Sequence, residues 1–327
     1  MSCNECCSSN GISNGVGSGK GSSALIFIGT GCSSGVPTPM CLMQPSDPPC
    51  EVCHKAMSAP PEINPNYRCN PSLLIDYDGE NGDHCYILID VGKNFKEQVL
   101  RWFLHYKIPQ IDAIILTHEH ADAVLGLDEI RGVQPYNRYN DIEPTTIYLN
   151  QFTMDSVTVK FPYLVQKKLK EGQEIRRVSQ LDWKIIENSC ERPFNVAGLQ
   201  FTPLPVMHGE DYESLGFLFG KNNKVAYVSD VSRFPDATEY VLSSSGGGQL
   251  DLLILDTLYK KGQHNTHFCL PQSLEAVKRL QPKRALFVGM THEFEHYRDN
   301  EELAEWSKRE GIDVQLACDG LRIPINL

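Results

Sequence analysis

Four short apolar segments of this chain each run directly into a side chain that can bind a metal ion. The segment 112–117 leads into THEHAD, and three later segments lead into PVMHGE, YVSDV and VGMTHEF. A lone aspartate after a strand is usually a turn former. Strand ends nevertheless hold side chains in fixed positions, so four such instances in one chain favour a shared metal site. The candidate ligands are His118, His120, Asp122, His208, Asp230 and His292.

The spacing within THEHAD suits metal binding. His118 and His120 stand two residues apart on an expected loop, so both rings can face one ion, and Asp122 can reach a second ion beside it. The alternative is that Asp122 caps the following helix beside two surface histidines. Ala123 comes next and offers no ligand atom.

The alternation of apolar runs with polar or glycine-rich turns predicts the fold class. We expect many short strands, with helices at 95–107, 271–280 and 300–311, the last one capped by Asn300. This pattern indicates an α/β fold with two mixed β-sheets packed face to face and helices outside. We expect a flexible tail at 1–23, rich in Ser, Gly and Asn, and a single domain at 24–327 with a Cys/Pro-rich loop at about 36–70. Strands are expected at 24–29, 72–77, 85–90, 112–117, 146–150, 183–186, 199–206, 215–220, 224–230, 251–256 and 284–289.

The composition narrows the classes of partner. The formal net charge is −11, which disfavours an extended nucleic-acid footprint because phosphate binding depends on Lys and Arg. The segment 165–177 is the one basic stretch, and glutamates dilute it. No apolar run approaches the ~20 residues of a membrane span. The N-terminal residues lack an apolar run and any Arg, so we expect a cytoplasmic protein.

Some of the twelve cysteines are expected to bind zinc rather than to form disulfides. Cys50 and Cys53 are spaced so that two thiolates can hold one ion, and three cysteines with one histidine form a closed tetrahedral zinc set. The loop at 36–70 has few apolar residues and needs some other source of stability. The alternative is a set of reduced thiols, and His54 is a rival fourth ligand.

The order His-x-His-x-Asp, followed by His, Asp and His at strand ends, resembles the metallo-β-lactamase superfamily. That resemblance covers most of the chain from about Ala24 and implies an αββα sandwich with one or two metals at its edge. In the usual motif a histidine follows the aspartate, where this chain has Ala123. The segments GTGCSSGVPTPMC, CEVC and THEFEH further resemble the cyclic phosphodiesterases of phosphonate catabolism and, more distantly, the tRNA 3′-processing endonucleases.

The resemblance assigns a role to each matching residue. It implies two divalent metals, zinc or manganese, with the second held more weakly because Ala123 supplies no ligand. It also implies a separate structural zinc. The first metal would be held by His118, His120 and His208, the second by Asp122 and His292, with Asp230 between them, and the structural zinc by Cys41, Cys50, Cys53 and His296.

The chemistry that suits these residues is hydrolysis. Metal-activated water would attack a phosphorus atom, and an alkoxide leaving group would need a proton. The resemblance gives that role to His267, with Asp122 as a second catalytic candidate, while His264 is expected to be a surface or capping residue. Arg68 is a weak candidate for binding an anionic substrate, with a surface arginine as the alternative.

The sequence therefore favours a phosphodiesterase acting on a small cyclic or nucleotide-like diester, in a protein that is either a monomer or a homodimer. An RNA-processing nuclease, a thioester or lactone hydrolase and a non-catalytic relative remain as alternatives, because a fold does not fix a substrate.

Overall fold

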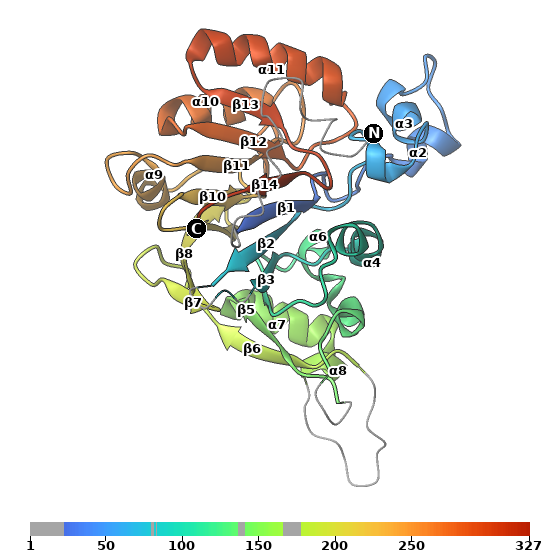
Figure 1. Cartoon of the computed structure of the whole chain (residues 1–327). Coiled ribbons are helices and arrows are strands. Elements are labelled where there is room, and N and C mark those ends of the chain that lie inside the picture. Colours follow the sequence, from blue (N-terminus) through green and yellow to red (C-terminus); the bar gives the residue numbers. More distant parts are fainter. Residues whose placement is uncertain (1–22, 80–81, 83, 137–140, 166–177) are drawn as a thin grey trace.

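Two seven-stranded β-sheets pack face to face in the computed structural model of the chain (Figure 1). The structure describes residues 23–327 except 80–81, 83, 137–140 and 166–177. Most of the basic stretch at 165–177 and nearly all of the expected tail at 1–23 therefore lie outside the described residues. Within the described residues, no helix is long and apolar enough to cross a membrane.

The first sheet has the order β14-β1-β2-β3-β4-β5-β6 and combines both kinds of strand pairing. The strands β14, β1, β2 and β3 pair antiparallel, whereas β3 to β6 pair in parallel. Its strands are β1 (Ala24–Gly29), β2 (Ser72–Asp78), β3 (His84–Ile89), β4 (Ala113–Ile115), β5 (Thr145–Leu149), β6 (Leu181–Ile185) and β14 (Arg322–Pro324).

The second sheet repeats this plan in the second half of the chain, with the order β13-β12-β11-β10-β9-β8-β7. Strands β7 to β10 pair antiparallel and β10 to β13 pair in parallel. Its strands are β7 (Phe194–Val196), β8 (Leu199–Met207), β9 (Glu213–Phe219), β10 (Val225–Val228), β11 (Leu252–Asp256), β12 (Arg284–Val288) and β13 (Asp313–Leu316).

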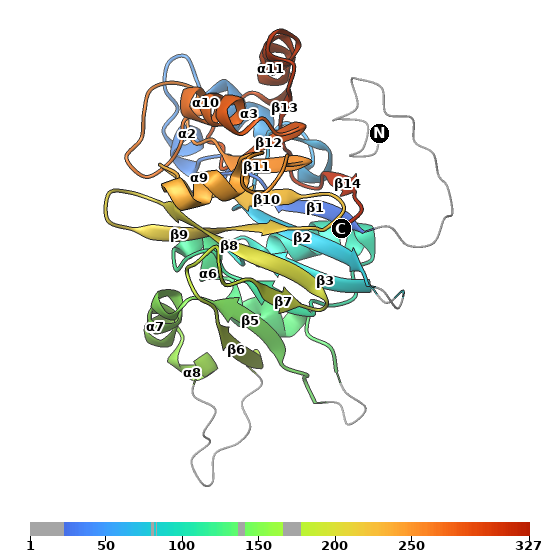
Figure 2. The same ribbon diagram turned by 90° about the vertical axis from the view of Figure 1, so that its left-hand side faces the viewer.

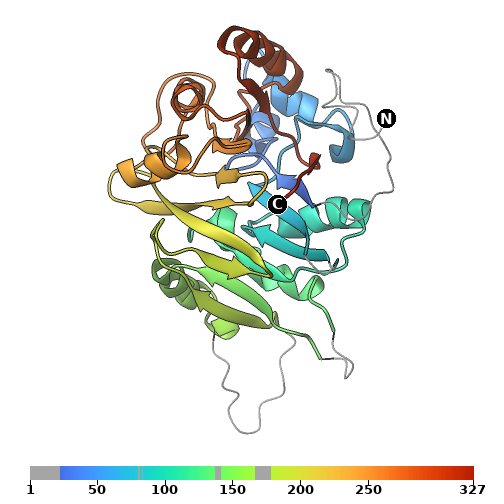
Figure 3. The ribbon, with the colours of Figure 1, turned by 60° about the vertical axis from the view of Figure 1, so that its left-hand side comes forward.

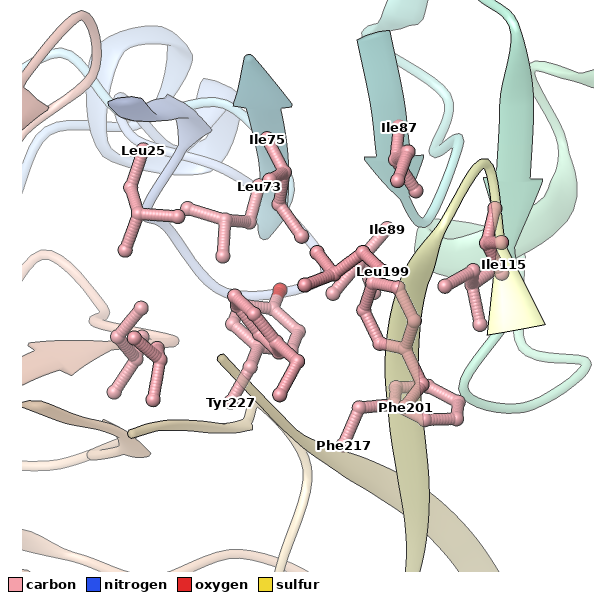
Figure 4. Close-up of a cluster of buried hydrophobic side chains, with 14 of the residues drawn as sticks. Leu25, Leu73, Ile75, Ile87, Ile89, Ile115, Leu199, Phe201, Phe217 and Tyr227 are labelled. Atoms are coloured by element: carbon pink, nitrogen blue, oxygen red, sulfur yellow. The ribbon is translucent and has the colours of Figure 1, made fainter. Parts of the chain in front are cut away.

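The strands alternate their apolar side chains between two cores. Leu25 and Phe27 of β1 belong to the central core between the sheets, together with Phe201 and Phe217 of the second sheet. Figure 4 shows Leu25 and these two phenylalanines in that core. Ile26 lies between them in sequence and faces the helices on the opposite side. Both faces of the sheets are covered, which explains the nearly continuous apolar runs in the sequence.

Helices form the two outer layers (Figures 1 and 2). Leu127 and Val157, from the segments on the outer side of the first sheet, belong to its apolar cluster, and Leu242, Val277 and Leu303 belong to the cluster on the second sheet. The expected αββα sandwich is confirmed. The helices are α2 (Pro39–Met43), α3 (Glu51–Ala56), α4 (Phe95–Gln98), α5 (Leu104–Tyr106), α6 (Ala121–Val124), α7 (Gln151–Lys160), α8 (Pro162–Val165), α9 (Asp236–Leu242), α10 (Leu270–Leu280) and α11 (His296–Glu310); short 3₁₀ turns are η1 (Pro61–Ile63) and η3 (Leu127–Gly132), and η2 (Val99–Phe103) is a π-helical turn that links α4 to α5.

Two expected helix starts differ from those in the structure. The last helix, α11, begins at His296 rather than after Asn300, because the Glu295 side chain caps it by accepting a hydrogen bond from the backbone N–H of Arg298. The residue at the N-cap of α6 is His120 rather than Asp122. Asp122 therefore does not cap the helix, and its carboxylate is free to interact with other groups.

Candidate metal centre and active site

Three histidine rings converge at the loops that follow β4 and β8. Ligand atoms of His118, His120 and His208 all lie within 4.8 Å of one another, and Nδ1 of His120 lies 3.3 Å from Nε2 of His208. His118 and His120 come from the loop between β4 and α6, and His208 directly follows β8. These three histidines are the residues that the family resemblance assigned to the first metal.

Hydrogen bonds determine which nitrogen each of the two buried rings, His118 and His208, can offer to a metal ion. Nδ1 of His118 lies 2.8 Å from the hydroxyl of Thr117, which itself donates to Asp90 and therefore accepts a proton from the ring. Nδ1 of His208 likewise donates to the carbonyl of Thr266 at 2.7 Å. Such partners orient metal-binding imidazoles and leave the other nitrogen with a free lone pair. Nε2 of His118 is buried and has no hydrogen-bond partner in the described part of the chain, as expected of a nitrogen that binds a metal ion.

Burial favours the neutral, metal-binding form of two of these rings, His118 and His208. Removal from water lowers the pKa of His118 to about 3 and also lowers the pKa of His208. For Asp230, burial by itself would raise the pKa, but attraction to the positive charge that the neighbouring rings can carry, His118 first, and the hydrogen bond from the Ser229 hydroxyl lower it. The donor set is thus three imidazoles beside the carboxylate of Asp230, which suits zinc or manganese.

Asp230 belongs to a second group of candidate ligands. Its ligand atom and those of His208 and His267 lie within 4.8 Å of one another. Nδ1 of His267 is 2.7 Å from Oδ2 of Asp256, whose side chain is completely buried at the end of β11. Burial disfavours a charged His267, but the charge of Asp256 and its hydrogen bond prevail and raise the pKa of His267 to about 9. The ring therefore carries a proton close to the metal-binding group.

Asp122 lies close to the same centre but in neither group. Burial, followed by the charge of Asp230, raises the pKa of Asp122 to about 6. The next residue, Ala123, is buried and belongs to the apolar cluster on the outer side of the first sheet, and it supplies no ligand atom.

The three cysteines meet a histidine in a separate cluster. Nδ1 of His292 lies 3.2 Å from Sγ of Cys41, 3.4 Å from Sγ of Cys50 and 3.5 Å from Sγ of Cys53. With zinc–sulfur and zinc–nitrogen bonds of about 2.3 and 2.0 Å, tetrahedral geometry separates such ligands by about 3.5 Å. The four residues fit a closed structural zinc site. In Figures 1 and 3 the cysteine-bearing helices α2 and α3 lie beside the start of α11.

This geometry corrects the roles of the two late histidines. His292 was expected at the active site and His296 at the cysteines, but His292 faces the cysteines. His296 is instead the first residue of α11, where Nε2 contacts the side-chain amide of Asn300. The loop after β12 carries His292 away from the active site and toward α3. His54 is exposed on α3 and lies outside the ligand group.

Arg68 is not positioned to bind substrate, so this candidate is also corrected. Its side chain is 1% exposed, and its guanidinium donates to the carbonyl of Thr291 at 3.3 Å. Burial lowers the pKa of Arg68 to about 10. Arg68 therefore braces the loop that carries His292, in the interior of the protein.

Sequence reasoning missed two residues that orient the site, Asp90 and Asp256. Asp90 follows β3 in a left-handed conformation, with φ of 64°, and accepts hydrogen bonds from the backbone and hydroxyl of Thr117. Both aspartates stand at strand ends, which is the same signal that identified Asp230.

The comparisons with known proteins agree with this arrangement. The model of the beta-lactamase superfamily domain matches residues 86–290, which is more than half of the chain. The chain belongs to the metallo-β-lactamase superfamily. A crystal structure described as a new diphosphatase from the PhnP family is 31% identical, with a TM-score of 0.71, and the match covers 93% of this chain and 98% of that one. Zinc-bound PqqB from Methylobacterium extorquens shares the fold at 17% identity, with a TM-score of 0.65 over 92% of this chain and all of that one.

Two matches to characterised sequences point to different activities. An octanoyltransferase of Porphyromonas gingivalis is 26% identical over 91% of this chain, but the chain spans about half of that protein's length, 52%. The ribonuclease Z of Metallosphaera sedula is 22% identical over 75% of this chain and 89% of its own length. The superfamily is therefore shown, while the substrate must be argued from the site.

Proposed function

We propose that this protein is a metal-dependent hydrolase of a small phosphodiester, with a nucleotide-like diester as its substrate class. The observation that carries the proposal is the convergence of three imidazoles, the carboxylate of Asp230 and the protonated ring of His267 in one site. When bound, a divalent metal supplies Lewis-acid chemistry: it makes a water molecule more acidic and offsets charge on a phosphoryl oxygen.

The chain itself supplies the proton for the leaving group. The alkoxide released from a phosphodiester is a strong base, and a positioned acid accelerates its departure. Nδ1 of His267 is engaged by Asp256, so the nitrogen that faces Asp230 and His208 is Nε2, which would give its proton to the leaving oxygen. Asp256 holds the ring in this orientation. Asp122, with its raised pKa, stands near the same point and could accept a proton from the attacking water.

An aromatic surface beside the histidines supports a substrate with a planar group. The ring of Tyr212 stacks on His120 at a centroid distance of 5.2 Å and an interplanar angle of 8°. The edge of Phe152 meets Tyr212 at 5.9 Å, and Phe152 is 59% exposed. The Tyr212 hydroxyl donates to Glu119 within the THEHAD motif, which holds the tyrosine against the centre. Exposed rings of this kind favour stacking with a nucleobase.

A panel of substrates tests the proposal. Purified protein with added Zn²⁺ or Mn²⁺ is expected to hydrolyse 2′,3′-cyclic nucleotides and bis-p-nitrophenyl phosphate, and to be much slower on a phosphomonoester. Turnover of a thioester or lactone, combined with inactivity on every diester, would instead support the alternative hydrolase. Cleavage of a structured RNA with no activity on small diesters would support the nuclease.

A further inference from the structure

The two groups of candidate ligands at the active site share one residue, His208. The first group is His118, His120 and His208, and the second is His208, Asp230 and His267. If the two groups were two metal sites, His208 would have to bind both ions.

His208 has a single nitrogen available for a metal. Its Nδ1 donates to the carbonyl of Thr266 at 2.7 Å, so Nε2 alone keeps a lone pair. That lone pair can form one bond to one metal ion. The two groups therefore cannot be two metal sites that both use His208. Because the proposed acid His267 keeps its proton, the second group adds only Asp230 to the ligands of the first group.

A second ion at this centre would lack the ligands that the sequence assigned to it. His292 lies with the cysteines, and Ala123 packs into the core. The position that directly follows β12 is Gly289, which has no side chain; a Cβ there would stand 2.4 Å from Oδ1 of Asp256. What remains of the expected second site is the carboxylate pair of Asp122 and Asp230, and among the described residues no group of three ligands includes Asp122.

We infer that the active centre holds one divalent ion rather than the two that the family resemblance implies, and that Asp122 is not one of its ligands. The ion is held by His118, His120, His208 and Asp230, and the water molecule that the proposed reaction needs would be its fifth ligand. This inference rests on the proposed metal-dependent function, but it concerns the number of ions and not the reaction.

Counting metal in the purified full-length chain tests the inference. After saturation with Zn²⁺ or Mn²⁺ and removal of loosely held ions, elemental analysis is expected to find two ions per chain, one at the centre and one at the cysteines. His118→Ala and Cys50→Ser should each lose one ion. Asp122→Asn should keep both, because the amide removes only a carboxylate that the ion does not use.

Three ions in the unmodified chain, falling to two in Asp122→Asn, would overturn the inference and leave the hydrolase proposal intact. One ion that is insensitive to His118→Ala would overturn the inference and the metal-dependent function together. If Cys50→Ser does not fold, the total in the unmodified chain still decides between two ions and three. Titration of the metal-free chain with Co²⁺, followed by visible absorption, gives an independent count, expected to saturate at two equivalents.

Discussion

Nδ1 of His267 lies 2.7 Å from Oδ2 of Asp256, a carboxylate with no exposed surface. Asp256 Oδ1 has no hydrogen-bond partner among the described residues, whereas Oδ2 also accepts a hydrogen bond from the backbone N–H of Val231 at 3.1 Å. In such surroundings a charge-assisted hydrogen bond both orients a ring and stabilises its proton. This geometry makes Asp256 a positioning residue for the proposed acid.

Replacing Asp256 by Asn should slow hydrolysis of substrates with a poor leaving group more than hydrolysis of substrates with a good one. Loss of such an orienting partner typically lowers activity about 10–100-fold. We expect this loss in kcat for a nucleoside diester, with KM little changed. With bis-p-nitrophenyl phosphate the loss should be small, because p-nitrophenolate leaves without a proton. Equal losses on both substrates would contradict the role of His267 as an acid.

His120→Ala should remove a metal ligand and at least about 10²-fold of the activity. The matched control is His54→Ala, because His54 is an exposed histidine on α3 and outside both active-site groups. Circular dichroism of both variants should match that of the unmodified protein. If the two substitutions reduce kcat/KM to the same extent, the assignment of the centre is wrong.

The two late histidines offer a direct test of the cysteine cluster. His292→Ala should lose one zinc per chain and lower the melting temperature, since a structural zinc site contributes folding free energy. His296→Ala should keep the zinc, even though the loss of a buried side chain also lowers stability. Zinc analysis of the two variants side by side decides which histidine is the ligand, and retention by His292→Ala would contradict the structure.

Phe152→Ala should weaken the use of substrates that carry a nucleobase. Base–aromatic stacking is worth about 1–3 kcal/mol, so kcat/KM for a nucleoside diester should fall at least about fivefold. A simple alkyl phosphodiester should be affected little. Val159→Ala is the control on the same helix, since Val159 is 81% exposed. If the nucleoside and alkyl diesters respond alike, Phe152 does not recognise a base.

Stability should fall as the pH rises from about 4 to about 7 because of Asp319. Its two oxygens accept hydrogen bonds from Thr30 and from the N–H of Cys69, but burial prevails and raises its pKa to about 7. The folded chain therefore keeps this proton when the unfolded chain, with a pKa near 3.9, has lost it. The loss can reach about 1.4 kcal/mol per pH unit within this window and ends above the folded pKa.

Asp319→Asn removes this titration, so its free energy of unfolding should vary less with pH than that of the unmodified protein. Denaturant unfolding of both proteins at several pH values measures the difference. Parallel curves between pH 4 and 7 would show that Asp319 does not hold the proton.

The strand-end rule accounts for most of what the sequence could predict. His118, His208 and Asp230 each lie shortly after a strand. Apolar runs predict strands well, and the rigid strand then fixes the position of the residues that follow it. The same rule applied to LID and LILD would have identified Asp90 and Asp256. Neither residue belongs to a candidate metal-ligand group. Their roles become visible only when the fold brings Asp90 to Thr117 and Asp256 to His267.

The late histidines could not be assigned from sequence alone. His292 and His296 both follow β12, and choosing between them depends on the path of an irregular loop. That path is set by Arg68, which holds the carbonyl of Thr291, and by the start of α11 at His296. Arg68 is 223 positions from Thr291 in the sequence, a distance at which local patterns carry no information. Most of the basic stretch at 165–177, which glutamates dilute, lies outside the described residues, so its role stays a prediction.

Both candidate metal sites draw residues from distant parts of the chain. The centre needs His208 and Asp230 in addition to His118, and the cysteine cluster of residues 41–53 needs His292. During synthesis the first sheet's leading strands and the three cysteines emerge long before these partners. A nascent chain that ends before His208 can complete neither site. The active centre has all its ligands once Asp230 has been synthesised, whereas the three cysteines must wait for His292. The two ions would therefore mark two different stages of synthesis, and a product truncated between Asp230 and His292 could hold only the ion of the active centre.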